Sequence, residues 1–435
     1  MIGFLAGLAA LLYCFVWLRP PELGGVALPV QRILGWSAIA LLLGRVLLKG
    51  PLTAGPAARS FLRWAAAFLA FLLLLLVRQL AYGEDFFPLY FVMDLSKYAA
   101  AFAMAYLCYY ALTTGLVSQR RLVRCIILSG GLATVLVFAL LALYFAGFRT
   151  DSQILAPSFG GALGVWPVGG FLPRLAGPTA EPQQLSVVLL TPLLLMLSRD
   201  YIRLAWPVAV LTGTALLLSQ SKFAVISLFI AAVYLYLVYR RWRWALVLGG
   251  VVAAPVLGVT LLRLPTFAST LQEGLSATAF VERMQNVLLL LRIIREHPIF
   301  GIGPGHYGVF WGRAVHGDPH YYPGYTPNMD FLKVFAETGV VGFVLLLLLL
   351  GFLSRLCLRG LRSIPASDRS IYLAAMLGGL GILLNMAIGY ELLHAFFWIN
   401  VGLLLYLADH HRANGSPGRG SGRDAHQELW PTASS

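Results

Sequence analysis

Long apolar runs constrain the fold of this chain more than any other feature of its sequence. Hydrophobic residues make up 59% of the 435 residues and charged residues 11%, against about 45–50% and about 25% in soluble globular proteins. A helix needs about 20 apolar residues to cross roughly 30 Å of hydrocarbon. The sequence therefore predicts an all-α polytopic membrane protein with about 12 transmembrane helices. The runs long enough to span are residues 1–18, 29–48, 61–78, 94–115, 123–146, 184–198, 204–220, 223–239, 244–262, 338–355, 371–389 and 393–408.

Composition also limits what the chain does. The formal charge of +14 does not come from basic residues clustered on a soluble face, so we expect no nucleic-acid binding. The four cysteines lie inside or at the ends of apolar runs, which does not suggest an exported disulfide framework. The opening segment MIGFLAGLAALLYCFVWLRP lacks a basic start and a cleavage site, so we interpret it as an uncleaved first span rather than a signal peptide.

Basic residues predict the orientation in the membrane. If the N-terminus is cytoplasmic, the inner segments carry 18 basic and 5 acidic residues, and the outer segments carry 12 of each. Because cytoplasmic loops are enriched in Lys and Arg, we expect both termini in the cytoplasm and the long loops 147–183 and 263–337 on the outer face. This gives one transmembrane domain over residues 1–409 and a disordered cytoplasmic tail over residues 410–435.

Two charged residues, Asp94 and Lys97, lie inside the predicted span 94–115. They are three residues apart and therefore share one face of a helix. Charges at this depth are costly unless they are paired, which favours a mutual ion pair and leaves a proton or ion path as the alternative.

A polar, glycine-rich and aromatic-rich island runs from Glu296 to Gly342. Because it lacks hydrophobic periodicity, a segment of this length is expected to be a functional loop or disordered, and its aromatic residues argue against disorder. Within it, His316, Asp318 and His320 have the spacing of metal ligands on one face of an extended segment. The sequence leaves open a metal site, a turn with incidental polar residues, and a histidine that acts as a base or binds substrate.

Three cations on the outer side are candidates for binding an anion. Arg174 precedes a predicted helix start at Glu181, whose carboxylate suits the helix dipole. Lys222 follows Ser221 in a tight turn, where it is either a snorkelling side chain or a phosphate ligand. Arg283 lies among apolar neighbours on a predicted amphipathic helix over residues 278–296, where an interfacial arginine is the simpler interpretation.

These motifs, in this order, resemble the O-antigen ligase and polymerase (Wzy-type) superfamily of bacterial inner-membrane enzymes. The resemblance rests on the arginine-containing loop RLAGPTAEP, the turn SQSK, HPIFGIGPG and NMDFLKVFAETGVVG, and it covers roughly residues 165 to 345. It implies a GT-C-like fold with a large periplasmic loop containing amphipathic helices. It also implies glycan transfer from undecaprenyl diphosphate at the periplasmic face.

Two departures from the ligase pattern favour a polymerase. Lys222 stands where the ligases have arginine, which keeps the charge but loses the planar fork. Pro327 stands where they have a histidine before Asn328, and His320 is the candidate replacement. The resemblance therefore implies a polymerase of O-antigen or exopolysaccharide repeat units, with an O-antigen ligase acting on lipid A core as the alternative. A polysaccharide transporter or flippase is the alternative outside enzymes.

The predicted site needs no metal and no cofactor, because diphosphate is a good leaving group that cations can stabilise. The expected partners are an undecaprenyl-diphosphate-linked glycan donor, a lipid-linked acceptor or lipid A core, the bilayer, and other polysaccharide-export proteins. The predicted catalytic residues are Arg283, Lys222 and His320. The predicted substrate-binding residues are Arg174, Glu181, Ser221, His306, Tyr321, Asn328 and Glu337.

Overall fold

The described part of the chain is almost entirely helical. The computed structural model describes residues 1–15, 30–50, 53–82, 87–146, 164–166, 174–179, 181–239, 278–320, 325–327, 329–387, 389 and 392–414. The helices of the first half are α1 Ile2–Leu11, α2 Val30–Lys49, α3 Pro56–Tyr82, α4 Pro88–Thr113, α5 Gln119–Phe145, α6 Pro182–Val188 and α7 Leu190–Met196. Those of the second half are α8 Ile202–Leu218, α9 Lys222–Tyr239, α12 Thr278–Glu296, α13 Tyr307–His316, α14 Asp330–Ser363, α15 Ala366–Met386 and α16 Ala395–Asn414.

Five described helices are long and apolar enough to cross a membrane, namely α3, α4, α5, α14 and α15. The prediction of a helical membrane protein is confirmed at this level. Every predicted span overlaps a helix except residues 244–262, which lie outside the described residues. The count of 12 stays a prediction, because α1 has 10 residues and at 1.5 Å per residue covers about half of a bilayer core.

The predicted span 184–198 is two short helices, α6 and α7, rather than one. They meet at Leu189, and almost every residue along both is buried. Such complete burial places this pair inside the bundle, where packing rather than lipid contact explains the apolar sequence.

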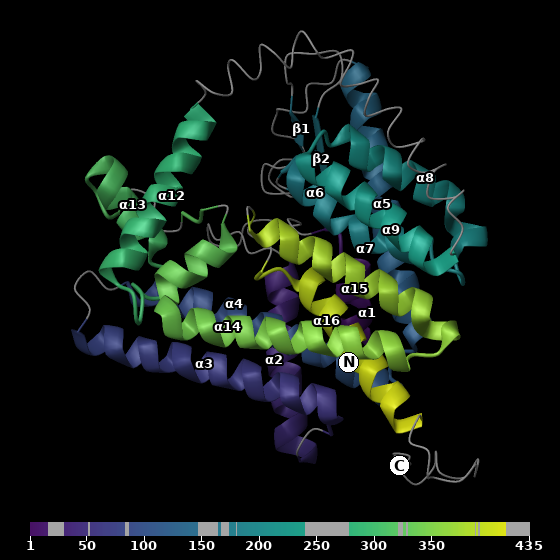
Figure 1. Cartoon of the computed structure of the whole chain (residues 1–435), viewed down its shortest axis with the longest axis horizontal. Coiled ribbons are helices and arrows are strands. Elements are labelled where there is room, and N and C mark those ends of the chain that lie inside the picture. Colours follow the sequence, from purple (N-terminus) through teal and green to yellow (C-terminus); the bar gives the residue numbers. More distant parts are fainter. Residues whose placement is uncertain are drawn as a thin grey trace.

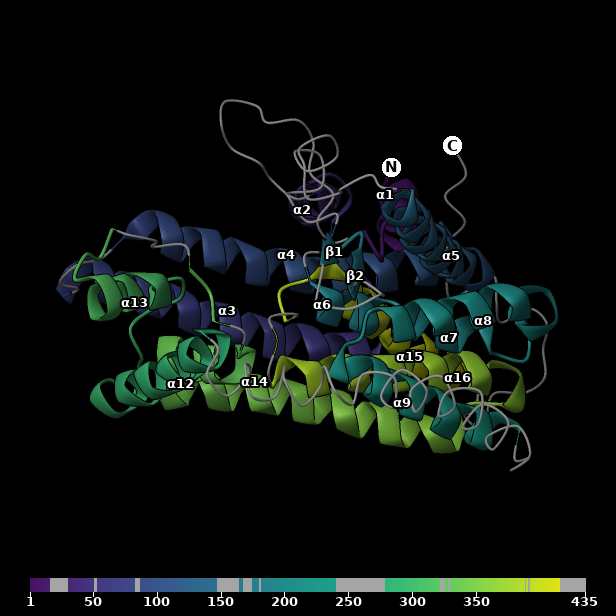
Figure 2. The ribbon, with the colours of Figure 1, turned by 90° about the horizontal axis from the view of Figure 1, so that it is seen from above.

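The long helices set the frame of the molecule. In Figures 1 and 2, α3, α4 and α14 run side by side, and α12 and α13 lie together at one end of this layer. Helices α5 to α9 pack with α15 on the other side. The polar island thus folds against the ends of three long helices.

The structure adds regular elements in three regions that the sequence assigned to loops or to the tail. The island is not a continuous loop, because it contains α13, which ends at the left-handed Gly317. The outer loop 147–183 contains a two-stranded antiparallel pair, β1 Gly164–Trp166 and β2 Arg174–Gly177, a small addition to a fold that is otherwise helical as predicted. Residues 410–414 continue α16.

Candidate functional site

Helix α14 is broken at Gly339, where φ is 64° and ψ is −170°. A side chain there would collide with the Ile299 carbonyl, so the motif requires glycine. The break leaves carbonyls before it and amides after it without helical partners. The preceding loop supplies those partners through four backbone hydrogen bonds, Ile302 N–H to Ala336 O (3.1 Å), Gly303 N–H to Glu337 O (2.8 Å), Val340 N–H to Pro298 O (2.8 Å) and Val341 N–H to Ile299 O (3.4 Å).

We call residues 298–306 together with 336–341 the clasp. Irregular backbone at the edge of a membrane span is tolerated only where protein satisfies its polar groups. The motifs HPIFGIGPG and AETGVVG are thus complementary halves of one main-chain structure.

His306 ends the clasp and joins it to the start of α4. Its Nδ1–H donates to the Pro304 carbonyl at 3.0 Å, and its Nε2 accepts the Phe87 N–H at 3.0 Å. A carbonyl only accepts and an amide only donates, so these partners fix a neutral imidazole. Burial lowers the pKa of His306, which also favours the neutral form.

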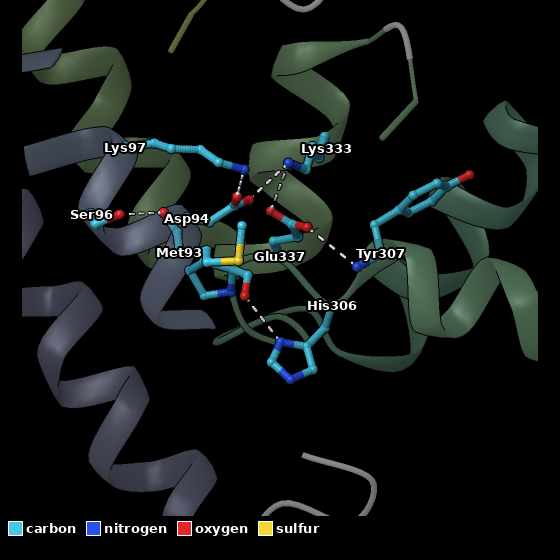
Figure 3. A network of polar contacts seen from close by, with 9 residues as sticks. Met93, Asp94, Ser96, Lys97, His306, Tyr307, Lys333 and Glu337 are labelled. Carbon is cyan, nitrogen blue, oxygen red and sulfur yellow. Dashed lines mark hydrogen bonds and ion pairs between the residues drawn. The ribbon is translucent and has the colours of Figure 1, made fainter. Parts of the chain in front are cut away.

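A buried charge network lies beside the clasp (Figure 3). Lys97 and Lys333 each bind one oxygen of Asp94, and the Lys333 Nζ to Asp94 Oδ2 distance is 3.0 Å. Lys333 also lies 3.7 Å from a carboxylate oxygen of Glu337, and Glu337 accepts the backbone N–H of Tyr307 at 3.3 Å. The network therefore carries two positive and two negative charges.

This network explains the charges that the sequence placed within a span. Asp94 and Lys97 do contact each other, as predicted, but Lys333 from α14 completes the arrangement. A single ion inside a membrane is costly, whereas balanced charges with hydrogen bonds are tolerated. The network therefore joins α4 to the first half of α14 and holds the clasp against the bundle.

Sequence reasoning gave Lys333 no role. The sequence does show that Lys333 and Glu337 are four residues apart and so lie on one face of a helix. Two opposite charges at that spacing beside an apolar run indicate an ion pair that is buried as a unit. The sequence does not show which helix packs against Lys333.

An aromatic and amide cluster holds α12 to α13. The Tyr307 hydroxyl donates to Asn286 Oδ1 at 2.8 Å, and Asn286 Nδ2 donates to the Tyr325 hydroxyl at 2.7 Å. Trp311 stacks on Tyr325 with ring centroids 4.3 Å apart. This cluster fixes α12, the helix that carries Arg283, to the clasp.

His320 lies on the exposed rim of the same region. Its ring meets Phe87 edge to face at 5.2 Å, and its backbone N–H donates to Asp318 at 2.8 Å. Phe87 therefore stands between the buried His306 and the exposed His320. His316 instead packs against Trp311. In the described ranges no three His, Cys, Asp or Glu side chains come together as metal ligands.

A second polar region surrounds residues 219–222, which we call the hydroxyl turn. Ser219 shares a hydrogen bond with Ser186 of α6 at 2.8 Å, and the Ser221 hydroxyl accepts the Phe223 N–H at 3.1 Å. Gln220 adopts a φ of 48° between them, a left-handed conformation unusual for glutamine. The two serines of the turn are thus buried, and the turn is shaped by hydroxyl groups and placed against α6.

Glu181 lies near the hydroxyl turn because α6 and β2 pack together there. It is the residue before α6, and Pro182 occupies the first turn as predicted. Arg174 is the first residue of β2 and Lys222 the first of α9, so the fold brings together the elements that carry three of the predicted residues.

The segment between α15 and α16 connects the two polar regions. Asp330, at the start of α14, accepts the Leu392 N–H at 2.8 Å and donates its own N–H to Gly389. His394, two residues beyond Leu392, lies 3.5 Å from Gln184 of α6. A short stretch of chain therefore touches both the network and the neighbourhood of the hydroxyl turn.

The predicted site residues fall into these two regions. His306, His320 and Glu337 lie at the clasp, and Ser221 and Glu181 lie at the hydroxyl turn. The structure places Arg174, Lys222 and Arg283 by their backbones only, and Tyr321 and Asn328 lie outside the described residues.

Residues 207–347 match the family model described as O-antigen ligase. This match bears out the resemblance to the O-antigen ligase and polymerase superfamily that the sequence motifs indicate. No curated protein matches the chain. The matched residues cover most of α8, all of α9, α12 and α13, and the first half of α14, which includes the clasp residues 336–341. They therefore include the hydroxyl turn, Arg283, His320 and Glu337.

Proposed function

We propose that this chain is a GT-C-type glycosyltransferase that polymerises undecaprenyl-diphosphate-linked repeat units into O-antigen or exopolysaccharide. The observation that carries the proposal is the match over residues 207–347, because this segment contains Lys222, Arg283 and His320. These are the three residues to which the sequence assigns chemistry. They stand on α9, on α12 and just beyond α13, next to the two polar regions.

The proposed reaction is a displacement at the anomeric carbon of the donor glycan. A hydroxyl oxygen of the acceptor forms the new bond to that carbon, and the bond from carbon to the diphosphate oxygen breaks. Lys222 and Arg283, with Arg174 in support, stabilise the charge that develops on the departing undecaprenyl diphosphate. His320 accepts the hydroxyl proton, for which its exposed position is suitable.

Substrate-binding roles follow from the same placement. Glu181 and Ser221 adjoin the cations at the hydroxyl turn, and His306 and Glu337 position the clasp beneath His320. We assign Tyr321 and Asn328 to the glycan, since they follow His320 and precede α14 in sequence.

A transfer assay tests the proposal. Purified protein incubated with lipid-linked repeat units should produce longer glycans on the lipid, and His320→Ala should lower the rate by about 10² to 10⁴. Transfer to lipid A core would instead assign an O-antigen ligase, which the description of the matched family favours. No new glycosidic bond would remove the enzyme proposal and favour a transporter.

We also propose that both termini are cytoplasmic and that the reaction takes place on the periplasmic face of the bacterial inner membrane. The charge asymmetry of the loops supports this orientation. A cysteine introduced at Gly317 should react with an impermeant thiol reagent in spheroplasts, and one at Gly418 should not. The reverse labelling would place the site in the cytoplasm.

A further inference from the structure

Arg45 lies inside a predicted transmembrane span, on the face of α2 that packs against α4. It continues the buried stripe formed by Leu34, Ala38 and Leu42 on one side of that helix. Its Nε donates to the Tyr110 hydroxyl of α4 at 3.1 Å, and its Nη1 is buried without a hydrogen-bond partner among the described residues. The guanidinium is therefore partly withdrawn from water, beside a hydroxyl that carries no charge to balance it.

The helices around Arg45 do not supply a counter-charge. Residues 23–83, which include all of α2 and α3, contain six basic and no acidic residues, and α4 has no acidic residue after Asp94. Asp409 of α16 lies at the start of α3, but its two oxygens accept backbone N–H groups of the first turn of α3 at 2.8 and 3.2 Å. Because an unbalanced charge within a membrane span is costly, we expect the balancing anion to come from outside the chain.

Tyrosines at the same end of α4 indicate that Arg45 lies at the level of the lipid headgroups. The Tyr106 hydroxyl donates to the Thr53 carbonyl at 3.1 Å, and the Tyr109 hydroxyl accepts the Gly55 N–H at 2.7 Å. These bonds hold the segment between α2 and α3 against the end of α4. Tyrosine is enriched where a membrane span meets water, because its ring is apolar and its hydroxyl is polar. This end of the bundle faces the cytoplasm in the proposed topology, and the cytoplasmic leaflet carries anionic lipids.

We propose that Arg45, Tyr110 and Lys49 bind the phosphate ester headgroup of an anionic phospholipid. Arg45 is only half-buried, so one edge of its planar fork remains accessible to phosphate oxygens. The Tyr110 hydroxyl accepts the hydrogen bond from Arg45 and keeps its own proton to donate to the same phosphate. Lys49 is exposed one turn further along α2 and adds a second cation on that face. This site is independent of the proposed glycan transfer, because it lies at the opposite end of α4 from the clasp.

Native mass spectrometry of bound lipid tests the site without requiring turnover. Full-length protein in a neutral detergent is titrated with phosphatidylglycerol or phosphatidylcholine. Both lipids carry a phosphate, but only phosphatidylglycerol has a net negative charge. We expect the wild type to bind one phosphatidylglycerol about tenfold more tightly than phosphatidylcholine, and Arg45→Gln to lose that preference. Tyr110→Phe keeps the ring and removes one neutral donor, so it should weaken phosphatidylglycerol binding by about two- to tenfold.

Arg359→Gln is the matched control, because Arg359 is an exposed cation near the end of α14 that faces the same side in the proposed topology. It should bind phosphatidylglycerol as the wild type does, and an equal loss there would overturn a specific site.

Three further outcomes would overturn the site. They are equal affinity of the wild type for the two lipids, an unchanged preference in folded Arg45→Gln, and competition by soluble glycerol phosphate as strong as that by the lipid. The last result would assign a site for a free phosphate ester instead. The unfolding midpoint of each variant shows whether it is folded. If Arg45→Gln does not fold, Tyr110→Phe decides, and wild-type affinity for phosphatidylglycerol in that variant would overturn the site.

Discussion

The clasp and the hydroxyl turn are both polar regions in an apolar chain, but they satisfy their polar groups in different ways. At the clasp, four backbone bonds and a charge network between α4 and α14 occupy the polar groups from within. At the hydroxyl turn, serine hydroxyls bond to one another and to nearby backbone, and the elements that carry Arg174, Glu181 and Lys222 meet beside them.

The difference indicates that the clasp has a structural role and that the hydroxyl turn has a role in binding an anion. A balanced and internally bonded network gains rigidity, which suits a structure that positions other residues. The two cations and one carboxylate carried beside the hydroxyl turn leave a formal excess of positive charge, which suits a place where an anion arrives from outside. We therefore expect substitutions at the clasp mainly to lower stability and substitutions at the turn mainly to lower the rate of catalysis.

The largest effect is expected at Lys333. Lys333→Met leaves Glu337 buried without its cation, and removing one partner of a buried pair typically costs about 3–5 kcal/mol. The unfolding midpoint of the solubilised protein should fall accordingly, and adding Glu337→Gln should restore part of it.

Arg292→Met is the matched control for Lys333→Met. Arg292 and Glu296 form a pair with the same spacing at 2.8 Å, but Arg292 is 70% exposed. Exposed pairs contribute little, so the midpoint should hardly change. Equal stability of the two variants would show that the network does not hold α4 to α14.

A smaller effect, on rate rather than stability, is expected at the cations. Lys222→Ala and Arg283→Ala should each lower turnover by about 10² to 10³, because each removes a charge that strengthens its contact in the transition state. Lys222→Arg should retain substantial activity. Arg203→Ala, near the opposite end of α8, is the control and should turn over normally. A folded Arg283→Ala protein with full activity would refute the site.

The smallest effect is a pH dependence of stability at His306. Its pKa is lowered in the folded protein, so its contribution is fully present above the ordinary value of about 6.5 and declines as pH falls below it. The loss is at most about 1.4 kcal/mol per pH unit for one group.

Thermal unfolding between pH 7.5 and pH 5 measures this dependence. The acid-induced decrease in stability should be smaller in His306→Gln than in the wild type. An identical pH profile in His306→Gln would mean that the imidazole does not hold the clasp to α4.

Much of the fold could be predicted from local signals in the sequence. Apolar periodicity located the long helices, and the predicted amphipathic helix over residues 278–296 coincides with α12. The helix start at Glu181 followed from its proline and acidic residue. These features depend on neighbours a few residues apart, which the sequence displays directly.

The elements and contacts of the candidate site could not be predicted from such local signals. Helix α13 was missed because a 10-residue helix lined with glycine and aromatic residues has weak propensity and is stabilised by its packing on Tyr325 and Asn286. The sequence predicts that His306 binds substrate, which stays a prediction, but it gives no sign that the ring nitrogens bond Pro304 and Phe87.

By itself, the sequence determined that this chain enters a membrane, where its long helices lie, and which superfamily it resembles, because hydrophobicity and motif order are properties of neighbouring residues. Only the tertiary structure decided that Asp94 binds Lys333, 239 residues away, and that the HPIFGIG loop closes the break at Gly339. Those contacts depend on which helices pack together. A buried charge or an open backbone group finds its partner across space rather than along the chain.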